Sequence, residues 1–382
     1  MDFHPRGSNR PEREGQGMDS DGGGILTHGD LGQLLDQGAI SAAVPILDVQ
    51  RQPTTLDLRL GSEAWELPAA FLPRGQPVEQ VARSLATARL DLTRGAVLRR
   101  GRVYLVPLLE SLDLPADIAG RANPRSSIGR VDVFTRTLSD RNDRFDDIPA
   151  GYRGPLWLEV LPRSFDVAVA TGTRLNQLRL VRGRHLLSDE TLAARVASDG
   201  LLLGGEALGL EHSCLLLGLS LRPERAGDPI GWRARCDAPM LDLTDTEARH
   251  PAPWFEPVHA DPDGSLVLQP EVFTLLAGSE RIAMPPDLAA EMIPWDIALG
   301  ELRTNYAGFF DPGFGWGHQS PDGARAVLEV RAHDVPFRVE HGQPLYRLRY
   351  SRTSSTCQHL YGGEDSAYQG QGLALARFFR LR

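Results

Sequence analysis

The chain repeats itself at a spacing of 170 residues, and this repeat constrains the fold more than any other feature. Leu158-Glu159-Val160 recurs as Leu328-Glu329-Val330, and the pattern that begins at Gly172 returns at Gly342. A repeat of this length corresponds to a whole domain. We therefore predict two copies of one domain, with a disordered N-terminal lead-in over 1–24, the first domain over 25–186 and the second over 187–382.

Each copy is expected to begin with a helix and to continue in short strands. Thr27-x-x-Asp30 and Ser188-x-x-Thr191 mark helix starts, with Gly38 and Gly200 as the matching stops. Leu56 to Leu60 alternates apolar and polar residues, which predicts a half-buried strand. Val103 to Leu108 is apolar throughout, which predicts a strand covered on both faces. The 39 glycines and 28 prolines indicate frequent turns. The chain is therefore predicted to be mainly β, a sandwich, jelly roll or barrel with a few short helices. Residues 244–264 are predicted to form a long surface loop.

The charge balance limits the kinds of partner. The net charge is −9, and all 41 basic residues are arginine. An acidic chain is a poor binder of nucleic acid or of membrane surfaces, so we expect neither. Cys214, Cys236 and Cys357 lie far apart, which favours a reducing cytoplasm over a disulfide framework. The first 24 residues do not resemble a signal peptide, and either Met1 or Met18 could be the start.

An anion site is the first candidate for chemistry. Residues 121–153 contain seven arginines and five aspartates, a net +2 in an acidic chain. The motif Arg125-Ser126-Ser127-x-x-Arg130 offers planar guanidinium donors and two hydroxyls, which suit a polyphosphate. The alternative interpretation is a solvated polar turn.

A glutamate within an apolar strand is the second candidate, and it occurs twice. Glu159 and Glu329 are each flanked by leucine and valine. A desolvated carboxylate has a raised pKa and can shuttle protons, whereas one on the open face of a strand only meets solvent. Both interpretations remain open from the strand pattern.

The C-terminal tail and two acidic turns complete the candidates. The tail, from Tyr361 through Tyr368 to Gln371, could close over a flat base or could be a frayed end. Asp311-Pro312-Gly313 in one copy and Asp147 in the other lie in ordinary turn sequences. No H-x-E and no C-x-x-C is present, so we expect no zinc site of the kind that nucleobase deaminases use.

In this order, the segments resemble the dCTP deaminase family of the dUTPase-like superfamily, in its long, duplicated bacterial form. The resemblance spans residues 25–382. The matching segments are Thr55 to Gly61, Leu114 to Asp117, Arg125 to Arg130, Gly151 to Gly154, Leu158-Glu159 and Tyr368 to Gln371.

The resemblance implies two distorted jelly rolls in a homo-oligomer, with nucleotide sites between neighbouring domains. It implies a catalytic set of Ser126, Arg130 and Glu159. It further implies Mg²⁺ carried by the triphosphate and no metal ligand from the protein; feedback by dTTP is left open. The implied substrate-binding residues are Arg125, Ser127, Asp147, Tyr152, Asp311, Tyr361, Tyr368 and Gln371.

The second copy departs from the family pattern. Trp295-Asp296-Ile297 stands where the first copy has Arg125-Ser126-Ser127, and Asp296 would repel phosphate. Either the first copy works alone, or one composite site combines its arginines with Glu329. We place catalysis on Glu159, because it shares a copy with the intact motif, and keep Glu329 as the alternative.

The predicted function is hydrolytic deamination of dCTP to dUTP and ammonia. The alternatives are a dUTP diphosphatase, an enzyme with both activities, and a nucleotide-binding regulator without turnover. The turn at Tyr152-Arg153-Gly154 resembles the diphosphatases, whereas the strand glutamate and the tail favour the deaminase.

Overall fold

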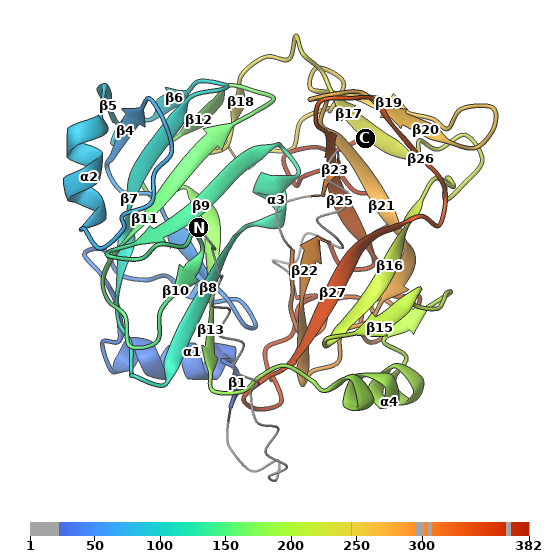
Figure 1. Ribbon diagram of the computed structural model, residues 1–382, viewed down its shortest axis with the longest axis horizontal. Coiled ribbons are helices and arrows are strands. Elements are labelled where there is room, and N and C mark those ends of the chain that lie inside the picture. The colour runs from blue at the N-terminus through green and yellow to red at the C-terminus, as the bar shows by residue number, and fades with distance from the viewer. Residues whose placement is uncertain (1–22, 246, 295–301, 305–307, 364–367, 382) are drawn as a thin grey trace, which may run out of the picture.

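The computed structural model describes residues 23–245, 247–294, 302–304, 308–363 and 368–381. It contains two β-rich halves that lie side by side, with the short helix α3 (Ser126–Gly129) on the side of the first half that faces the second (Figure 1). Each half is built of curled, mostly antiparallel sheets. The prediction of a mainly β chain with jelly-roll-like domains is confirmed.

The first half contains a five-stranded and a six-stranded sheet. In the first, β13 lies between β1 and β8 and also pairs with β3; in the second, β11 lies between β7 and β9. The strands are β1 (Gly24–Ile25), β2 (Ile40–Ala42), β3 (Leu56–Arg59), β4 (Glu63–Leu67), β5 (Ala88–Asp91), β6 (Ala96–Leu98), β7 (Val103–Asp113), β8 (Ile118–Pro124), β9 (Val133–Ser139), β10 (Asp147–Ile148), β11 (Arg153–Pro162), β12 (Val167–Val169) and β13 (Arg174–Arg182).

The second half contains an eleven-stranded sheet and a two-stranded sheet. Its β21–β25 and β22–β27 pairs repeat the β7–β11 and β8–β13 pairs of the first half. The strands are β14 (Leu202–Leu203), β15 (Gly209–Glu211), β16 (Cys214–Ser220), β17 (Gly231–Ala234), β18 (Leu241–Asp242), β19 (Phe255–Val258), β20 (Leu266–Leu268), β21 (Thr274–Ile282), β22 (Leu288–Pro294), β23 (Leu302–Thr304), β24 (Phe309–Phe310), β25 (Ala324–Ala332), β26 (Phe337–Val339) and β27 (Pro344–Arg352).

Both predicted opening helices are present with the expected ends. The N–H of Thr27 donates to Asp30 at 2.8 Å at the start of α1 (His28–Asp36), and Gly38 follows it with φ of 74°. Ser188 accepts from the N–H of Thr191 at the start of α4 (Asp189–Asp199), which ends at Gly200. The helix α2 (Val78–Leu85) and the 3₁₀ turn η1 (Asp48–Gln50) were not predicted. Within the described residues, no helix is long and apolar enough to cross a membrane.

The two halves share part of their core. Strand β18 of the second half pairs in parallel with β12 of the first. Trp254, Phe255, Phe378 and Phe379 of the second half belong to the same buried apolar cluster as the first half's strands. The domain division after residue 186 stays a prediction, because these contacts extend across it.

Three local expectations are corrected. Asp57 and Arg59 are buried together with the apolar residues of β3, so this strand is covered on both faces. The region 244–264 is more than a surface loop, because β19 within it pairs with β17. Gly24, which the sequence assigned to the lead-in, is a strand residue that pairs with Arg182; residues 1–22 lie outside the described residues.

Candidate active site

A pocket lies between the two halves and combines side chains from both. It brings the Arg-Ser-Ser segment of the first half together with Glu329 and the C-terminal tail of the second. The pocket is lined by Gln52, Asp57, Arg125, Ser126, Ser127, Arg130, Gln177, Met292, Gly308, Phe309, Phe310, Asp311, Phe314, Val327, Glu329, Tyr361, Tyr368, Gln371 and Arg377.

The Arg-Ser-Ser segment forms a single helical turn at the end of β8. Arg125 keeps extended backbone angles and donates its N–H to the carbonyl of Leu175 at 3.0 Å. The chain then turns, and the N–H of Arg130 donates to the carbonyl of Ser126 at 3.1 Å. This turn places Ser126, Ser127 and both arginines on one rim of the pocket.

Glu329 reaches the pocket because of strand alternation. In β25, Val327 and Glu329 are partly exposed and line the pocket, whereas Leu328 and Val330 between and after them point into the core. The carboxylate lies against the backbone of Gly129, where an added Cβ would overlap it. A side chain at this position in α3 would therefore displace the end of Glu329.

Arg125 is held in place by a buried carboxylate. Its Nε lies 3.1 Å from Oδ1 of Asp57, and Arg174 donates to Oδ2 of the same carboxylate at 3.2 Å. Burial raises the pKa of Asp57, and the two arginines oppose this shift. Asp57 thus orients a guanidinium group that would otherwise rotate freely.

Arg130 is bound by the tail. Its guanidinium lies 3.8 Å from the centre of the Tyr368 ring and donates to Oε1 of Gln371 at 2.9 Å and to the carbonyl of Ala374 at 3.0 Å. The tail of the second half therefore closes on the anion motif of the first half. The sequence placed both elements at the site without indicating this contact.

Asp311, which also lines the pocket, joins the two halves. It accepts from the side chain of Arg179 at 2.7 Å and from the hydroxyl of Thr54. Arg179 is buried, and burial lowers its pKa while Asp311 opposes the shift. The carboxylate of Asp311 is thus tied to the first half, with its turn beside Tyr361, whose N–H donates to the carbonyl of Pro312 at 2.8 Å.

Glu159 is not among the residues that line the pocket. It lies in β11, directly across from Arg136 of β9, and accepts from that guanidinium at 2.5 and 2.8 Å. Burial raises the pKa of Glu159, and Arg136 opposes this shift. Side chains alternate between the two faces of the strand in both copies. The structure nevertheless does not bring Glu159 to the Arg-Ser-Ser segment.

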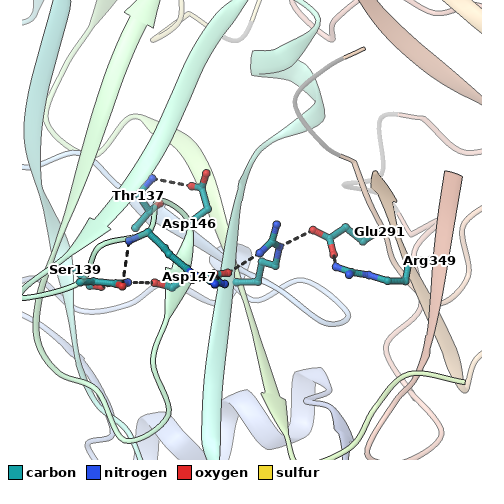
Figure 2. A network of polar contacts seen from close by, with 9 residues as sticks. Thr137, Ser139, Asp146, Asp147, Glu291 and Arg349 are labelled. Atoms are coloured by element: carbon teal, nitrogen blue, oxygen red, sulfur yellow. Dashed lines mark hydrogen bonds and ion pairs between the residues drawn. The ribbon is translucent and has the colours of Figure 1, made fainter. Parts of the chain in front are cut away.

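Asp147 and Tyr152 also lie away from the pocket. Asp147 pairs with Arg121 at 2.5 Å, and Arg121 in turn contacts Glu291 of the second half at 2.8 Å (Figure 2). The hydroxyl of Tyr152 donates to the carbonyl of Pro155 at 2.7 Å, and burial raises its pKa to about 12. Both side chains are used in local structure.

The arginine-rich segment contributes less to the pocket than its composition indicated. Of its seven arginines, only Arg125 and Arg130 line the pocket. Four others form ion pairs with acidic side chains elsewhere, and these are Arg121, Arg136, Arg144 and Arg153. The net charge of the segment therefore did not locate the site.

Several lining residues were missed at the sequence level. Arg377 supplies a third guanidinium group. The backbone N–H of Arg377 donates to the hydroxyl of Tyr368 at 3.0 Å. Asp57 and Gln177 come from strands to which the sequence analysis gave no role in the site. Phe309 and Phe310 provide apolar surface beside Asp311. Only Asp57, a charge within an apolar strand, carried a signal that could have been used.

The degenerate segment Trp295-Asp296-Ile297 and Gly300, which stands where the first copy has Arg130, lie outside the described residues. Among the residues that are described, no group of three or more histidine, cysteine, aspartate or glutamate side chains is arranged to hold a metal ion.

The fold and pocket define a tandem β protein with a pocket between its halves, lined by three guanidinium groups and a strand glutamate among its described residues. The chain belongs to the 2′-deoxycytidine 5′-triphosphate deaminase family. The sequence profile of that family's N-terminal domain matches residues 22–184, and the profile of its C-terminal domain matches residues 188–379.

Individual relatives agree with this assignment. The crystal structure of 2′-deoxycytidine 5′-triphosphate deaminase from Agrobacterium tumefaciens is 40% identical, superposes with a TM-score of 0.83, and covers 87% of this chain and 100% of its own. The dUMP-forming dCTP deaminase of Beutenbergia cavernae is 35% identical over 119 residues, which are 30% of this chain and 58% of that protein. The dCTP deaminase of Natronomonas pharaonis is 29% identical over 159 residues, 40% of this chain and 78% of that protein. The chain thus spans 58% of the length of the first of these two relatives.

Proposed function

We propose that the protein deaminates dCTP hydrolytically, to dUTP and ammonia, at the pocket between its two halves. The observation that carries this proposal is the contact between the Arg-Ser-Ser turn of the first half and Glu329 of the second. The family membership and the names of the relatives support the same reaction.

In this proposal the guanidinium groups hold the triphosphate. Arg125, oriented by Asp57, and Arg377 offer donors at one end of the pocket. Phe309 and Phe310 supply apolar surface for the nucleoside. Mg²⁺ would arrive bound to the triphosphate, because the nearby Asp57 and Asp311 carboxylates are already paired with arginines.

Glu329 is our candidate for proton transfer. A water held near Ser126 would attack C4 of the cytosine, and Glu329 would accept its proton and pass it to the departing amino group, which leaves as ammonia. Arg130, fixed by Tyr368 and Gln371, would keep the tail over the reacting base. Glu329 replaces Glu159 as our choice, because the latter lies outside the pocket and is paired with Arg136.

A combined deaminase and diphosphatase is the second candidate, since the Beutenbergia relative is named dUMP-forming. The pairing of Asp311 with Arg179 and Thr54 favours the simpler reaction, because both contacts hold this carboxylate to the first half rather than to a water that attacks phosphorus. Product analysis separates the two: dUTP with ammonia supports our proposal, and dUMP with pyrophosphate supports the second candidate.

The choice of glutamate is tested by two matched variants. We expect Glu329→Gln to lower kcat for ammonia release by about 10²- to 10⁴-fold, because the amide cannot accept the proton. dCTP binding, measured by calorimetry, should persist. Glu159→Gln should retain turnover and lose mainly stability, because it leaves Arg136 without its counter-charge. The reverse result would return catalysis to Glu159.

We further propose a cytoplasmic enzyme that assembles as a homo-oligomer. Light scattering of the purified protein would report the assembly. dTTP titrated into the deamination reaction would report whether this nucleotide regulates it.

A further inference from the structure

A second, buried ion pair crosses between the halves beside the pocket. Arg331 of β25 pairs with Oδ2 of Asp132, and their residues are only 6% and 1% exposed. The same carboxylate oxygen accepts from the hydroxyl of Ser164 at 2.6 Å. A buried pair of this kind is a weak source of stability, because its desolvation cost offsets its attraction. The position of this ion pair therefore says more about its role than its contribution to stability does.

Each partner lies two residues from a group of the proposed catalytic site. Arg331 follows Glu329 at the spacing that places two side chains on the same side of a strand. Asp132 follows Arg130, and its N–H donates to the carbonyl of Gly129 at 2.8 Å, so it closes the turn that carries α3. The ion pair thus connects the strand of the glutamate directly to the turn of the Arg-Ser-Ser segment.

The backbone at Asp132 is held in an unfavourable conformation. Its φ is 56°, in the left-handed region that non-glycine residues rarely occupy. The carbonyl of Asp132 accepts from the N–H of Arg163 at 3.0 Å, so backbone and side chain are both fixed. Such strain persists where the surroundings determine the geometry strongly, and it is typical of functional sites.

The repeat shows that this ion pair has no counterpart at the equivalent place in the other copy. At the spacing of 170 residues, Arg331 corresponds to Leu161, so the strand of Glu159 has no arginine at the equivalent position. The ion pair can therefore form only where the Arg-Ser-Ser turn meets the strand that carries Glu329.

We propose that Asp132 and Arg331 are positioning residues, which fix Glu329 relative to the α3 turn across the boundary between the halves. This inference rests on the proposed function. A misplacement of reacting groups by about 1 Å can cost about 10²-fold in rate. Loss of the pair should therefore act on the chemical step more than on substrate binding.

The experiment compares Arg331→Met, Asp132→Asn and the double variant in the full-length protein. We expect each single variant to lower kcat for ammonia release by about 10- to 100-fold, with much less change in KM. The double variant should be less impaired than the sum of the two single variants, because the residues share one contact, while Arg331 also donates to the carbonyl of Glu271. Arg331→Lys, which keeps the charge, should recover part of the rate.

Arg121→Met is the matched control. It also removes an ion pair between the halves, with Glu291, but Arg121 does not line the pocket or contact α3. It should lower the unfolding temperature and leave kcat unchanged. Hydrogen exchange provides a readout without turnover: the N–H groups of Arg130 and Asp132 should lose protection in Arg331→Met and keep it in Arg121→Met.

The outcomes separate this inference from the proposed function. Unchanged kcat and unchanged exchange in both single variants would overturn the positioning role. Additive effects in the double variant would do the same, because they would show that the residues act separately. An unaltered protein that releases no ammonia would instead overturn the proposed function, and the exchange data would still decide whether the pair fixes α3.

Discussion

At the scale of single residues, the contact that defines the site involves a residue without a side chain. Gly129 lets the carboxylate of Glu329 lie against the backbone of α3, and the Cβ of a larger residue would displace the end of that side chain. The same glycine follows Arg-Ser-Ser-Ile in the sequence, where it looks like a simple turn residue. Its role is visible only when the second half is placed beside it.

Replacing this glycine gives a direct test of the composite site. In Gly129→Ala, the new methyl group would displace the flexible end of Glu329 while the backbone of the turn is retained. We expect kcat for dCTP deamination to fall by about 10²-fold, because the carboxylate moves by about 1 Å or more. Gly29→Ala is the matched control, since a Cβ at Gly29 of α1 meets only an ordinary contact. Equal activity of both variants would remove Glu329 from the site.

At the scale of elements, the tail behaves as a strap that is attached at both ends. One end is held where Tyr361 bonds to Pro312. The other is held by Phe379, which packs against Trp254 and Phe255 with ring centres 5.5 Å apart in each case. Between these points, the strap covers Arg130. Phe379 itself does not line the pocket, although Arg377, two residues before it, does.

Weakening that anchor should affect the pocket. We expect Phe379→Ala to release the tail end and to raise KM for dCTP, because Arg130 loses its fixed partners Gln371 and Ala374. Hydrogen exchange of the Arg377 and Arg380 N–H groups should accelerate. Leu381→Ala, at a side chain that is 56% exposed, should change neither quantity. Unaltered exchange and KM in Phe379→Ala would show that the strap does not need its anchor.

Elements also differ in how far their sequence determined them. The limits of α1 and α4 were predictable because their capping residues act locally. The burial of β3 was not, because Asp57 and Arg59 can be buried only where Arg125, Arg174 and Glu110 meet them from distant segments. A local pattern of alternating polarity does not reveal partners that lie far away along the chain.

At the scale of the whole molecule, the two halves are joined by charged groups whose protonation affects folding. Asp146, next to Asp147 of the network in Figure 2, has its pKa raised by burial to about 7 from 3.8. Its carboxylate accepts from the N–H of Thr137 at 2.8 Å. The folded protein thus binds a proton that the unfolded chain has already released between about pH 4 and pH 7.

The sign of the pH dependence follows from this difference. The contribution of Asp146 to stability is present at low pH and is lost as the pH rises through about 7. In Asp146→Asn the titration disappears, while the amide oxygen can still accept from Thr137. We expect the variant to exceed the unaltered protein in free energy of unfolding at pH 8 by about 1–3 kcal/mol, since the residue is only partly buried.

Urea unfolding at pH 5 and at pH 8 measures this difference. Asp143→Asn, at an exposed residue of the same loop, serves as the control and should leave the pH dependence unchanged. If Asp146→Asn and the unaltered protein lose stability in parallel between these pH values, the buried proton does not exist.

The amino-acid sequence alone determined the duplication, the mainly β architecture, the helix ends and the motifs of the family, because each depends on local patterns or on internal repetition. It also placed the arginines and hydroxyls of one copy and the tail of the other at the site. Only the tertiary structure decided which glutamate meets them. Glu159 and Glu329 have the same neighbours along the chain, but Arg136 lies across the sheet from the first and the α3 turn of the opposite half lies against the second.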